Sequence, residues 1–384
     1  MIIPMETAGD GKMNKRILTY ILTIVLSAVF LFAFGSYASK GVEIFSGSVK
    51  TESAEIISVD SLTSASFGEF SSEVIICTAK ITSGKYKGNT VDVYQEYNSK
   101  MPNTNLVEAG DRVIIKNYPM EERGIYWAVD SHRRTPVLIF MAILFFASII
   151  ILGKTKGLRT VVSLIYTCAA VFCVFIPWIL SGKNIYAGVV IVCGFITLMT
   201  LLLVNGFDRK TLCAFLGCAG GVVAAALITI VFSWIMNFSG YTNEHSYYLT
   251  SLPHSPDLSA IAFSAVLIGA VGAVMDVAMS MSSSLYELSE KVPDISFGSL
   301  VASGFSIGRD MMGTMANTLV LAYVGSSLTS VLLILTYSDS ISDILNKEAI
   351  AYEILQAIAG SMGILLAIPV TAFFCGVFYI KNKK

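Results

Sequence analysis

Long apolar runs separated by short polar loops make up most of this chain of 384 residues. We expect membrane-spanning helices over residues 17–35, 136–153, 158–180, 185–204, 212–236, 258–284, 316–337 and 354–380. Each run is close to the ~20 residues that an α-helix needs to cross ~30 Å of hydrocarbon. The pattern therefore predicts a mainly α-helical polytopic membrane protein with about eight transmembrane helices.

The polar segment between the first two runs, residues 39–135, alternates apolar and polar positions with the period of two that is typical of β-strands. Glycine-containing turns interrupt this alternation, as at Gly88-Asn89 and Gly110-Asp111. About five or six short strands fit a small barrel or sandwich, and an OB-like barrel is one candidate. We therefore divide the chain into the amino terminus with the first span (1–38), an all-β module (39–135) and a membrane domain of about seven helices (136–384).

The first apolar run follows Lys12, Lys15 and Arg16, an order shared by signal peptides and signal anchors. Its length of about 19 residues exceeds the usual core of a signal peptide, which favours an uncleaved span. Small residues around Ala38 leave cleavage as the alternative.

Composition agrees with a membrane location, because 54% of the residues are hydrophobic, 14% are charged and the mean hydropathy is +0.70. With a formal net charge of −1, the chain lacks the excess of basic residues that is typical of nucleic-acid-binding proteins. Six of the seven cysteines lie in apolar runs, so Cys77 has no partner for a disulfide within the β module.

Basic residues predict the orientation, because Lys and Arg in short loops accumulate on the cytoplasmic side. With the amino terminus inside, thirteen basic residues of the termini and short loops are cytoplasmic and only Lys183 and Lys347 lie in short outer loops. Arg133 and Arg134 fit less well, since they flank the outer end of the second span. We expect a membrane protein with both termini cytoplasmic and the β module extracytoplasmic.

Asp276 is the most informative residue, because it places a carboxylate inside an apolar run. Together with Gly269, Gly272, Ser280, Ser283 and Glu287 it recurs at steps of three and four, which puts these residues on one helical face. A close packing seam explains the small residues but gives no reason for the carboxylate. Intramembrane ionisable residues usually mark a partner or a water-filled path, so Asp276, Ser280, Ser283 and Glu287 are candidate path residues.

The block from Gly308 to Ser327 supplies the other candidates, Arg309, Asp310, Thr314 and Asn317. Of these, Arg309, Thr314 and Asn317 could face Asp276 in an antiparallel helix pair. The simpler interpretation is that Asp310 complements a helix dipole and Arg309 marks the cytoplasmic boundary. The Gly- and Ser-rich segment just before it, residues 296–312, fits an interfacial helix, a re-entrant half-span or the start of a long helix.

No Walker loop, GxSxG elbow, CxxC or HExxH occurs in the sequence. His132, His245 and His254 all fall on the predicted outer side without metal-ligand spacing. We therefore expect no catalytic residue, metal or cofactor, and an intramembrane enzyme has the least support.

GAVMDVAMSMSSSLYEL, GRDMMGTMANTLVLAYVGSS and NGFDRKTL together resemble the YibE/F-like family of multi-pass bacterial membrane proteins. The resemblance runs from about Ser131 to the carboxyl terminus. It implies a bacterial cytoplasmic-membrane location and supplies no reaction. Its motifs coincide with Asp276, Ser280, Glu287, Arg309, Asp310, Thr314 and Asn317 without assigning them roles.

Two functions fit this sequence. The first is a transporter or channel for a small solute or ion with Asp276 in the path. The alternative is a non-transporting scaffold or assembly factor, whose β module docks an envelope protein partner or whose bundle forms a homo-oligomer. In both cases the lipid bilayer is a partner and nucleic acid is not.

Overall fold

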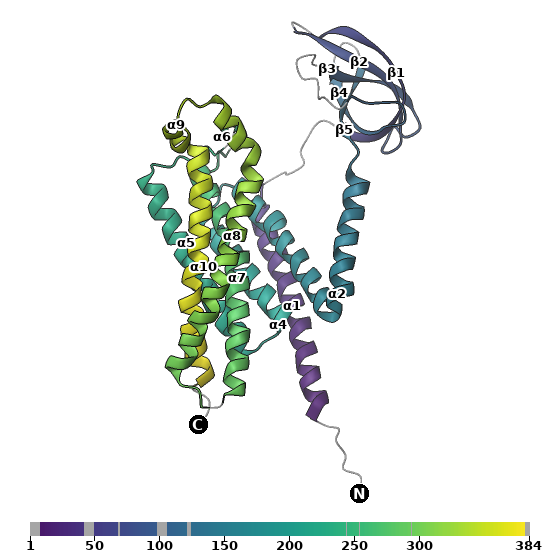
Figure 1. The fold of residues 1–384 in the computed structure, drawn as a ribbon. Helices are drawn as coiled ribbons and strands as arrows, with labels where there is room; N and C mark the ends of the chain where they lie inside the picture. The colour runs from purple at the N-terminus through teal and green to yellow at the C-terminus, as the bar shows by residue number, and fades with distance from the viewer. Residues whose placement is uncertain are drawn as a thin grey trace. The chain divides into compact units, whose positions relative to one another are not determined.

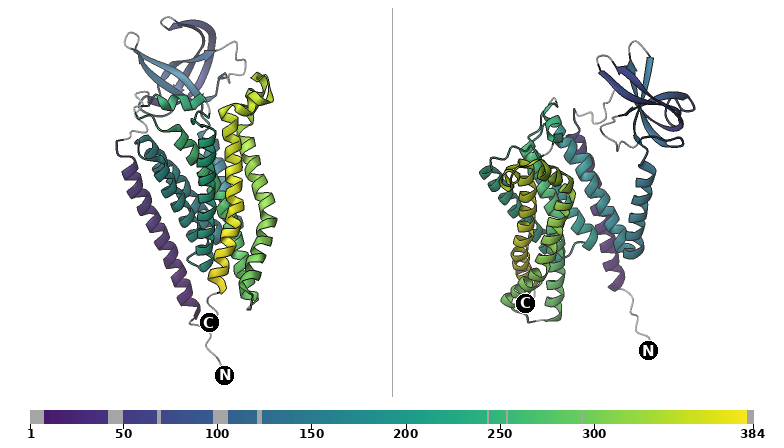
Figure 2. Two further views of the ribbon diagram at one scale, coloured as in Figure 1. Left: turned by 90° about the vertical axis from the view of Figure 1, so that its left-hand side faces the viewer. Right: turned by 45° about the horizontal axis from the view of Figure 1, so that its top comes forward.

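The computed structural model describes residues 8–41, 50–67, 70–97, 106–120, 124–242, 244–252, 254–292 and 294–380. The chain forms two compact units, one of residues 43–148 and one of residues 1–42 with 149–384. The first holds all five described strands and the second nearly all of the helices (Figures 1 and 2).

The β module is a closed five-stranded barrel. Around the barrel the strand order is β1-β2-β3-β5-β4, antiparallel except for the parallel pair β3 and β5. The strands are β1 (Lys50–Phe67), β2 (Phe70–Ile81), β3 (Thr90–Tyr97), β4 (Arg112–Met120) and β5 (Gly124–His132). The predicted all-β module is thus confirmed, and closure leaves no free sheet edge within it.

The barrel interior is filled by alternate strand residues such as Ile56, Val93, Ile115 and Trp127. Cys77 belongs to this core and is fully buried. Burial, with a smaller contribution from Asp60, raises the pKa of the Cys77 thiol to about 11. Near neutral pH the group is therefore a protonated, unreactive core side chain.

The helices are mostly long. They are α1 (Ala8–Ala38), α2 (Thr135–Ala169), the π-helix η1 (Ala170–Phe175), α3 (Ile176–Leu180), α4 (Ile185–Asn205), α5 (Arg209–Ile235), α6 (Glu244–Thr250), α7 (Leu258–Lys291), α8 (Phe297–Tyr337), α9 (Ile341–Asn346) and α10 (Glu348–Ile380). Within the described ranges, 7 helices are long and apolar enough to cross a membrane.

The difference from the expected eight spans arises at Lys154. The second and third predicted spans lie in one 46-residue helical stretch, Thr135–Leu180, which is interrupted by the non-helical backbone of Lys154 (φ 49°, ψ −126°). The corner is tight, since a Cβ built on Gly157 would lie 2.1 Å from the carbonyl oxygen of Ile149. In a straight helix these residues would be about 12 Å apart along the axis. The second and third predicted spans are therefore two apolar helical segments joined at this corner.

Residues 296–312, left open by the sequence, form the start of a long helix. α8 runs without a break over 41 residues, and the Ser296 side chain caps it by accepting from the backbone N–H of Ser299. The predicted span at 316–337 is only the second half of this helix. The Gly and Ser residues are accommodated because Gly304 and Gly308 pack against Ala372 and Ile368 of α10.

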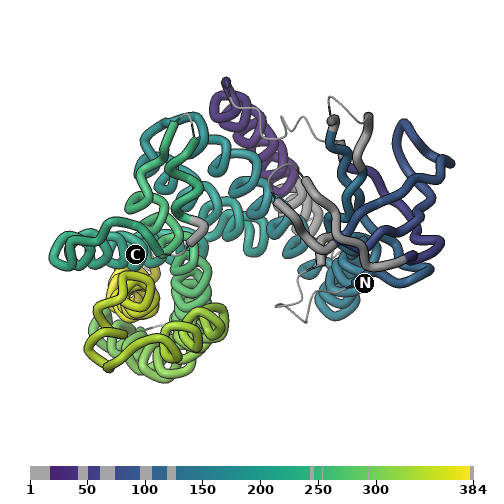
Figure 3. The backbone as a smooth tube through the Cα atoms, turned by 90° about the horizontal axis from the view of Figure 1, so that it is seen from above, coloured from purple at the N-terminus to yellow at the C-terminus, as the bar shows by residue number. Residues whose placement is uncertain are grey.

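α10 packs against α5, α7 and α8 (Figure 3). Its contact with α5 is close, because Gly217, Gly220 and Gly221 leave no room for side chains opposite Thr371, Val370 and Gly363. This is the small-residue packing expected between membrane helices, where lipid offers no hydrophobic driving force for association.

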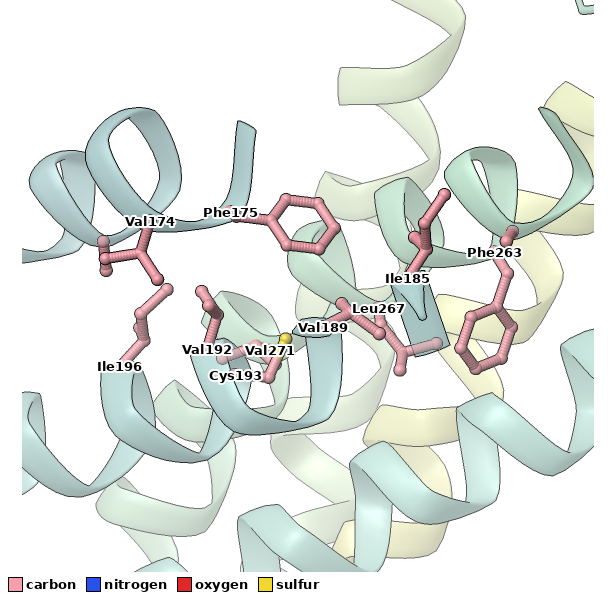
Figure 4. Close-up of a cluster of buried hydrophobic side chains, with 12 residues drawn as sticks. Val174, Phe175, Ile185, Val189, Val192, Cys193, Ile196, Phe263, Leu267 and Val271 are labelled. Carbon is pink, nitrogen blue, oxygen red and sulfur yellow. The ribbon is translucent and has the colours of Figure 1, made fainter. Parts of the chain in front are cut away.

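A second apolar cluster joins α7 to α4 and η1 (Figure 4). Phe263, Leu267 and Val271 of α7 meet Val189 and other residues of α4. Together with the α5 and α10 contacts, this cluster leaves only part of the α7 circumference open. That remaining part carries the candidate site.

Candidate functional site on the open face of α7

The open face of α7 is its polar face. Gly272, Asp276, Ser280 and Glu287 are exposed, while Val274, Val277, Ala278 and Met281 between them are buried. Ser283 is half-buried at the edge of this face. Helical periodicity placed these polar residues together, and the structure confirms that they share one face.

Asp276 has no partner in the described part of the chain. It lies near the middle of α7, 18 residues after Leu258 and 15 before Lys291. No ion pair or hydrogen bond is formed by its carboxylate among these residues. A carboxylate at this position of a membrane helix is therefore open on the outer surface of the single chain.

The second group of candidates lies on α8. Arg309, Asp310, Thr314 and Asn317 are exposed, because the opposite side of the helix carries Gly308 against α10. Thr314 Oγ1 donates to the carbonyl of Met311 (3.0 Å). Within the described ranges, no hydrogen bond or ion pair joins this group to Asp276. The predicted pairing between the two groups is therefore not formed in this structure.

A polar pocket of about 350 Å³ lies at the carboxyl-terminal end of α7. It is lined by Asp208, Arg209, Lys210, Tyr286, Ser289, Glu290 and Tyr379. Beside it, Ser282 donates to the carbonyl of Lys210 (2.8 Å) and contacts the hydroxyl of Tyr379 (2.7 Å). In the sequence, Asp208 to Lys210 belong to the segment NGFDRKTL, and nothing in that segment signals contact with α7 and α10.

A polar cluster that the sequence did not identify surrounds Gly269, nearer the other end of α7. A Cβ built on Gly269 would lie 2.5 Å from the hydroxyl oxygen of Tyr323 and 3.7 Å from Nε2 of Gln356. Glu353, about one helical turn before Gln356, lies near Ser327 of α8, whose hydroxyl donates to the carbonyl of Tyr323 (2.6 Å). The predicted span began at residue 354, just after Glu353, so the sequence interpretation did not include this carboxylate in a span.

The histidines do not form a metal site in the described residues. His132 Nε2 lies 3.3 Å from a carboxylate oxygen of Asp111, and His254 is exposed. The side chain of His245 lies outside the described residues. No group of three or more His, Cys, Asp or Glu residues suited to a metal ion occurs in the described part of the chain.

Comparison with known proteins identifies the family of this chain. A family model described as YibE/F-like protein matches residues 141–381, which is more than half of the chain. No curated protein and no solved structure matches.

Proposed function

Because the chain belongs to the YibE/F-like family of membrane proteins, we propose that it is a transporter or channel for a small solute or ion. The proposed path follows the open face of α7. Asp276 is the charged residue that the solute or ion contacts, and Ser280, Ser283 and Glu287 lie beside it. The exposed polar residues of α8, Arg309, Asp310, Thr314 and Asn317, are included in the proposed path as a second polar group, which does not contact Asp276 in this structure.

The observation that carries this proposal is an unpaired carboxylate on the one open face of a central helix. Exposing such a group to hydrocarbon costs roughly 2.5–3.5 kcal/mol by insertion scales. A water-filled path or a bound cation removes that cost, whereas a simple anchor has no need of the carboxylate. The cluster at Gly269 lies two turns before Asp276 on the same side of α7, whereas the polar pocket beside Tyr286 lies on the side that meets α5 and α10.

A scaffold is the second candidate, and a different observation favours it. The barrel has the strand order of an OB-like module and exposes apolar side chains, including Ile57 (51%) and Leu106 (40%). Exposed apolar side chains suit docking of an envelope protein where they form one continuous patch. A second copy of the chain covering Asp276 is the corresponding arrangement within the membrane.

Asp276→Asn separates these functions. If Asp276 serves a path, the variant is expected to insert and fold at the wild-type level and to lose complementation of a deletion strain. Asp343→Asn in α9 is a matched control, because that carboxylate lies on a half-exposed surface in an ion pair with Lys347 (3.4 Å). Activity and folded yield are measured in the same cells. Full activity of Asp276→Asn with normal yield would contradict the proposal.

Water on this face can be tested without knowing the solute. In a cysteine-free background, Ser280→Cys is expected to react with a charged methanethiosulfonate reagent, since only a hydrated thiol ionises. Val324→Cys on the exposed apolar surface of α8 is the matched control and is expected to resist the same reagent. Equal resistance at both positions would favour the scaffold.

We also infer that the barrel is extracytoplasmic and both termini are cytoplasmic, from the distribution of basic residues. In a cysteine-free background, Lys87→Cys in the barrel is expected to react with an impermeant maleimide in intact cells. Lys156→Cys at the corner of α2 is expected to react only after the cells are opened. Both positions are exposed in the structure, so accessibility within the protein does not bias the comparison. The reverse labelling pattern would overturn the orientation.

A further inference from the structure

Most of the surface of α8 is uncovered in the single chain. Of its 41 residues, only Leu300, Gly304, Gly308 and Ser327 are buried. α8 lies at the periphery of the bundle, where α10 separates it from α5 (Figure 3). The uncovered surface includes small, polar and charged residues, all of them exposed, namely Ser306, Arg309, Asp310, Gly313 and Asn317.

Arg309 and Asp310 lie at the level of the middle of α10. The preceding residue, Gly308, packs against Ile368, since a Cβ built on it would lie 2.3 Å from Cγ2 of that side chain. Ile368 is 14 residues after the start of the apolar run 354–380 and 12 before its end, about 21 and 18 Å along the helix. The two charges are therefore near the middle of the apolar layer and not at its cytoplasmic boundary.

Neither charge is neutralised within the described part of the chain. Arg309 and Asp310 form no ion pair there, with each other or with another residue, and Asn317 has no hydrogen-bond partner for its side chain. Ionisable residues within membrane segments almost always face a bundle interior, a cavity or a partner. Exposed charges of both signs at this depth indicate that another surface covers this side of α8.

The arrangement of these residues on the helix defines a contact line. At 100° per residue, the line midway between Arg309 and Asp310 points away from α10, within about 30° of the side opposite Gly304 and Gly308. Ser306 and Gly313 lie within about 10° of this line and Asn317 within about 30°. Small residues on such a line allow two helix backbones to approach closely.

We propose that two copies of this chain associate through parallel α8 helices around a twofold axis. In such an interface, residue i of one copy contacts residue j of the other, and j contacts i. Since Arg309 and Asp310 flank the contact line, Arg309 of each copy meets Asp310 of the other. The two resulting ion pairs neutralise all four charges on either side of Ser306 and Gly313.

A second copy fits better than an unrelated partner, because the twofold axis supplies the complementary charges from the same sequence. Asn317 agrees with this choice, since an amide carries donors and an acceptor and pairs with its own counterpart near the axis. The inference does not rest on the proposed transport function, because it concerns only how the charges of α8 are neutralised.

Charge exchange tests this interface in the full-length protein. Two copies with different affinity tags are expressed in the same cells, and copurification from mild detergent is measured. Arg309→Asp alone and Asp310→Arg alone should each reduce copurification at least about tenfold, since like charges then face each other. Arg309→Asp expressed together with Asp310→Arg should restore it, because each copy carries the charges that the other lacks. A folding defect cannot give this pattern.

Two glycines of α8 provide a matched pair of variants. A Cβ on either Gly313 or Gly325 meets no atom of its own chain within 4 Å, but Gly325 lies about 110° from the contact line. Gly313→Leu should therefore separate the copies, whereas Gly325→Leu should retain the wild-type level of copurification.

Cross-linking in membranes locates the interface before any detergent is added. In a cysteine-free background, Ser306→Cys should form a disulfide-linked dimer on oxidation with copper phenanthroline. Ser280→Cys on α7 should remain monomeric under the same conditions. Absence of the dimer in Ser306→Cys, its formation in Ser280→Cys instead, or no restoration when the two charge variants are expressed together would overturn the proposal.

Discussion

Gly157→Ala is expected to prevent accumulation of the folded protein. The added Cβ would lie 2.1 Å from the carbonyl oxygen of Ile149 and 3.1 Å from Cα of Ile150, so the obstacle is backbone and not a movable side chain. Overpacking typically costs about 1–3 kcal/mol and more where the neighbour cannot yield. We expect a loss of at least about 3 kcal/mol, since relief requires opening the α2 corner at Lys154.

Gly153→Ala is the matched control, because the same change four residues earlier meets nothing within 4 Å. It should be neutral or slightly stabilising, as alanine is favoured over glycine in helices by about 1 kcal/mol. Fluorescence-detected gel filtration of detergent extracts, followed by thermal unfolding of the purified protein, measures both effects. Equal yield and unfolding temperature for the two variants would show that the corner is not formed as described.

Gly221→Ala is expected to separate α5 from α10. Its Cβ would lie 2.6 Å from Cγ1 of Val274, 2.7 Å from the carbonyl oxygen of Gly363 and 2.8 Å from Cβ of Ala367. Three helices meet at this point, so no single side-chain rotation relieves the overlap. We expect destabilisation by about 2–3 kcal/mol, at the upper end of the usual overpacking range.

Gly194→Ala in α4 serves as the control for this seam, since its Cβ would meet no atom within 4 Å. Both variants carry the same added methyl group on a membrane helix. A lower unfolding temperature for Gly221→Ala alone would establish the α5 and α10 contact. Equal unfolding temperatures for the two variants would show that α5 and α10 are less closely packed than in the structure.

Asp276 shows that helical periodicity predicts which residues share a face but not which residues of another helix they contact. Steps of three and four correctly placed it with Gly272 and Ser280 on one face, since helical geometry fixes that arrangement locally. Its partner was predicted among Arg309, Thr314 and Asn317, and the structure forms no such pairing in its described residues. Which side of α8 meets α7 depends on helix rotation and crossing, which the glycines opposite α10 decide.

Glu353 shows the opposite case, a residue whose surroundings depend on distant segments. In the sequence it stands at the polar edge of the last apolar run, where a glutamate is unremarkable. Its partners Ser327 and Tyr323 come from α8, and room for the Tyr323 hydroxyl comes from Gly269 on α7. No sequence pattern within a single helix predicts that these residues of α7, α8 and α10 lie close together.

The sequence by itself determined the elements, namely the apolar helices, the alternating strands of the barrel and the polar face of α7. It could do so because a backbone in lipid must satisfy its hydrogen bonds internally, and because periods of 3.6 and 2 are local properties. The tertiary structure alone decided the corner at Gly157, the unbroken course of α8, the openness of Asp276 and the cluster at Tyr323. Each of these depends on where small residues let separate helices approach, and packing between segments is not encoded in the periodicity of any one of them.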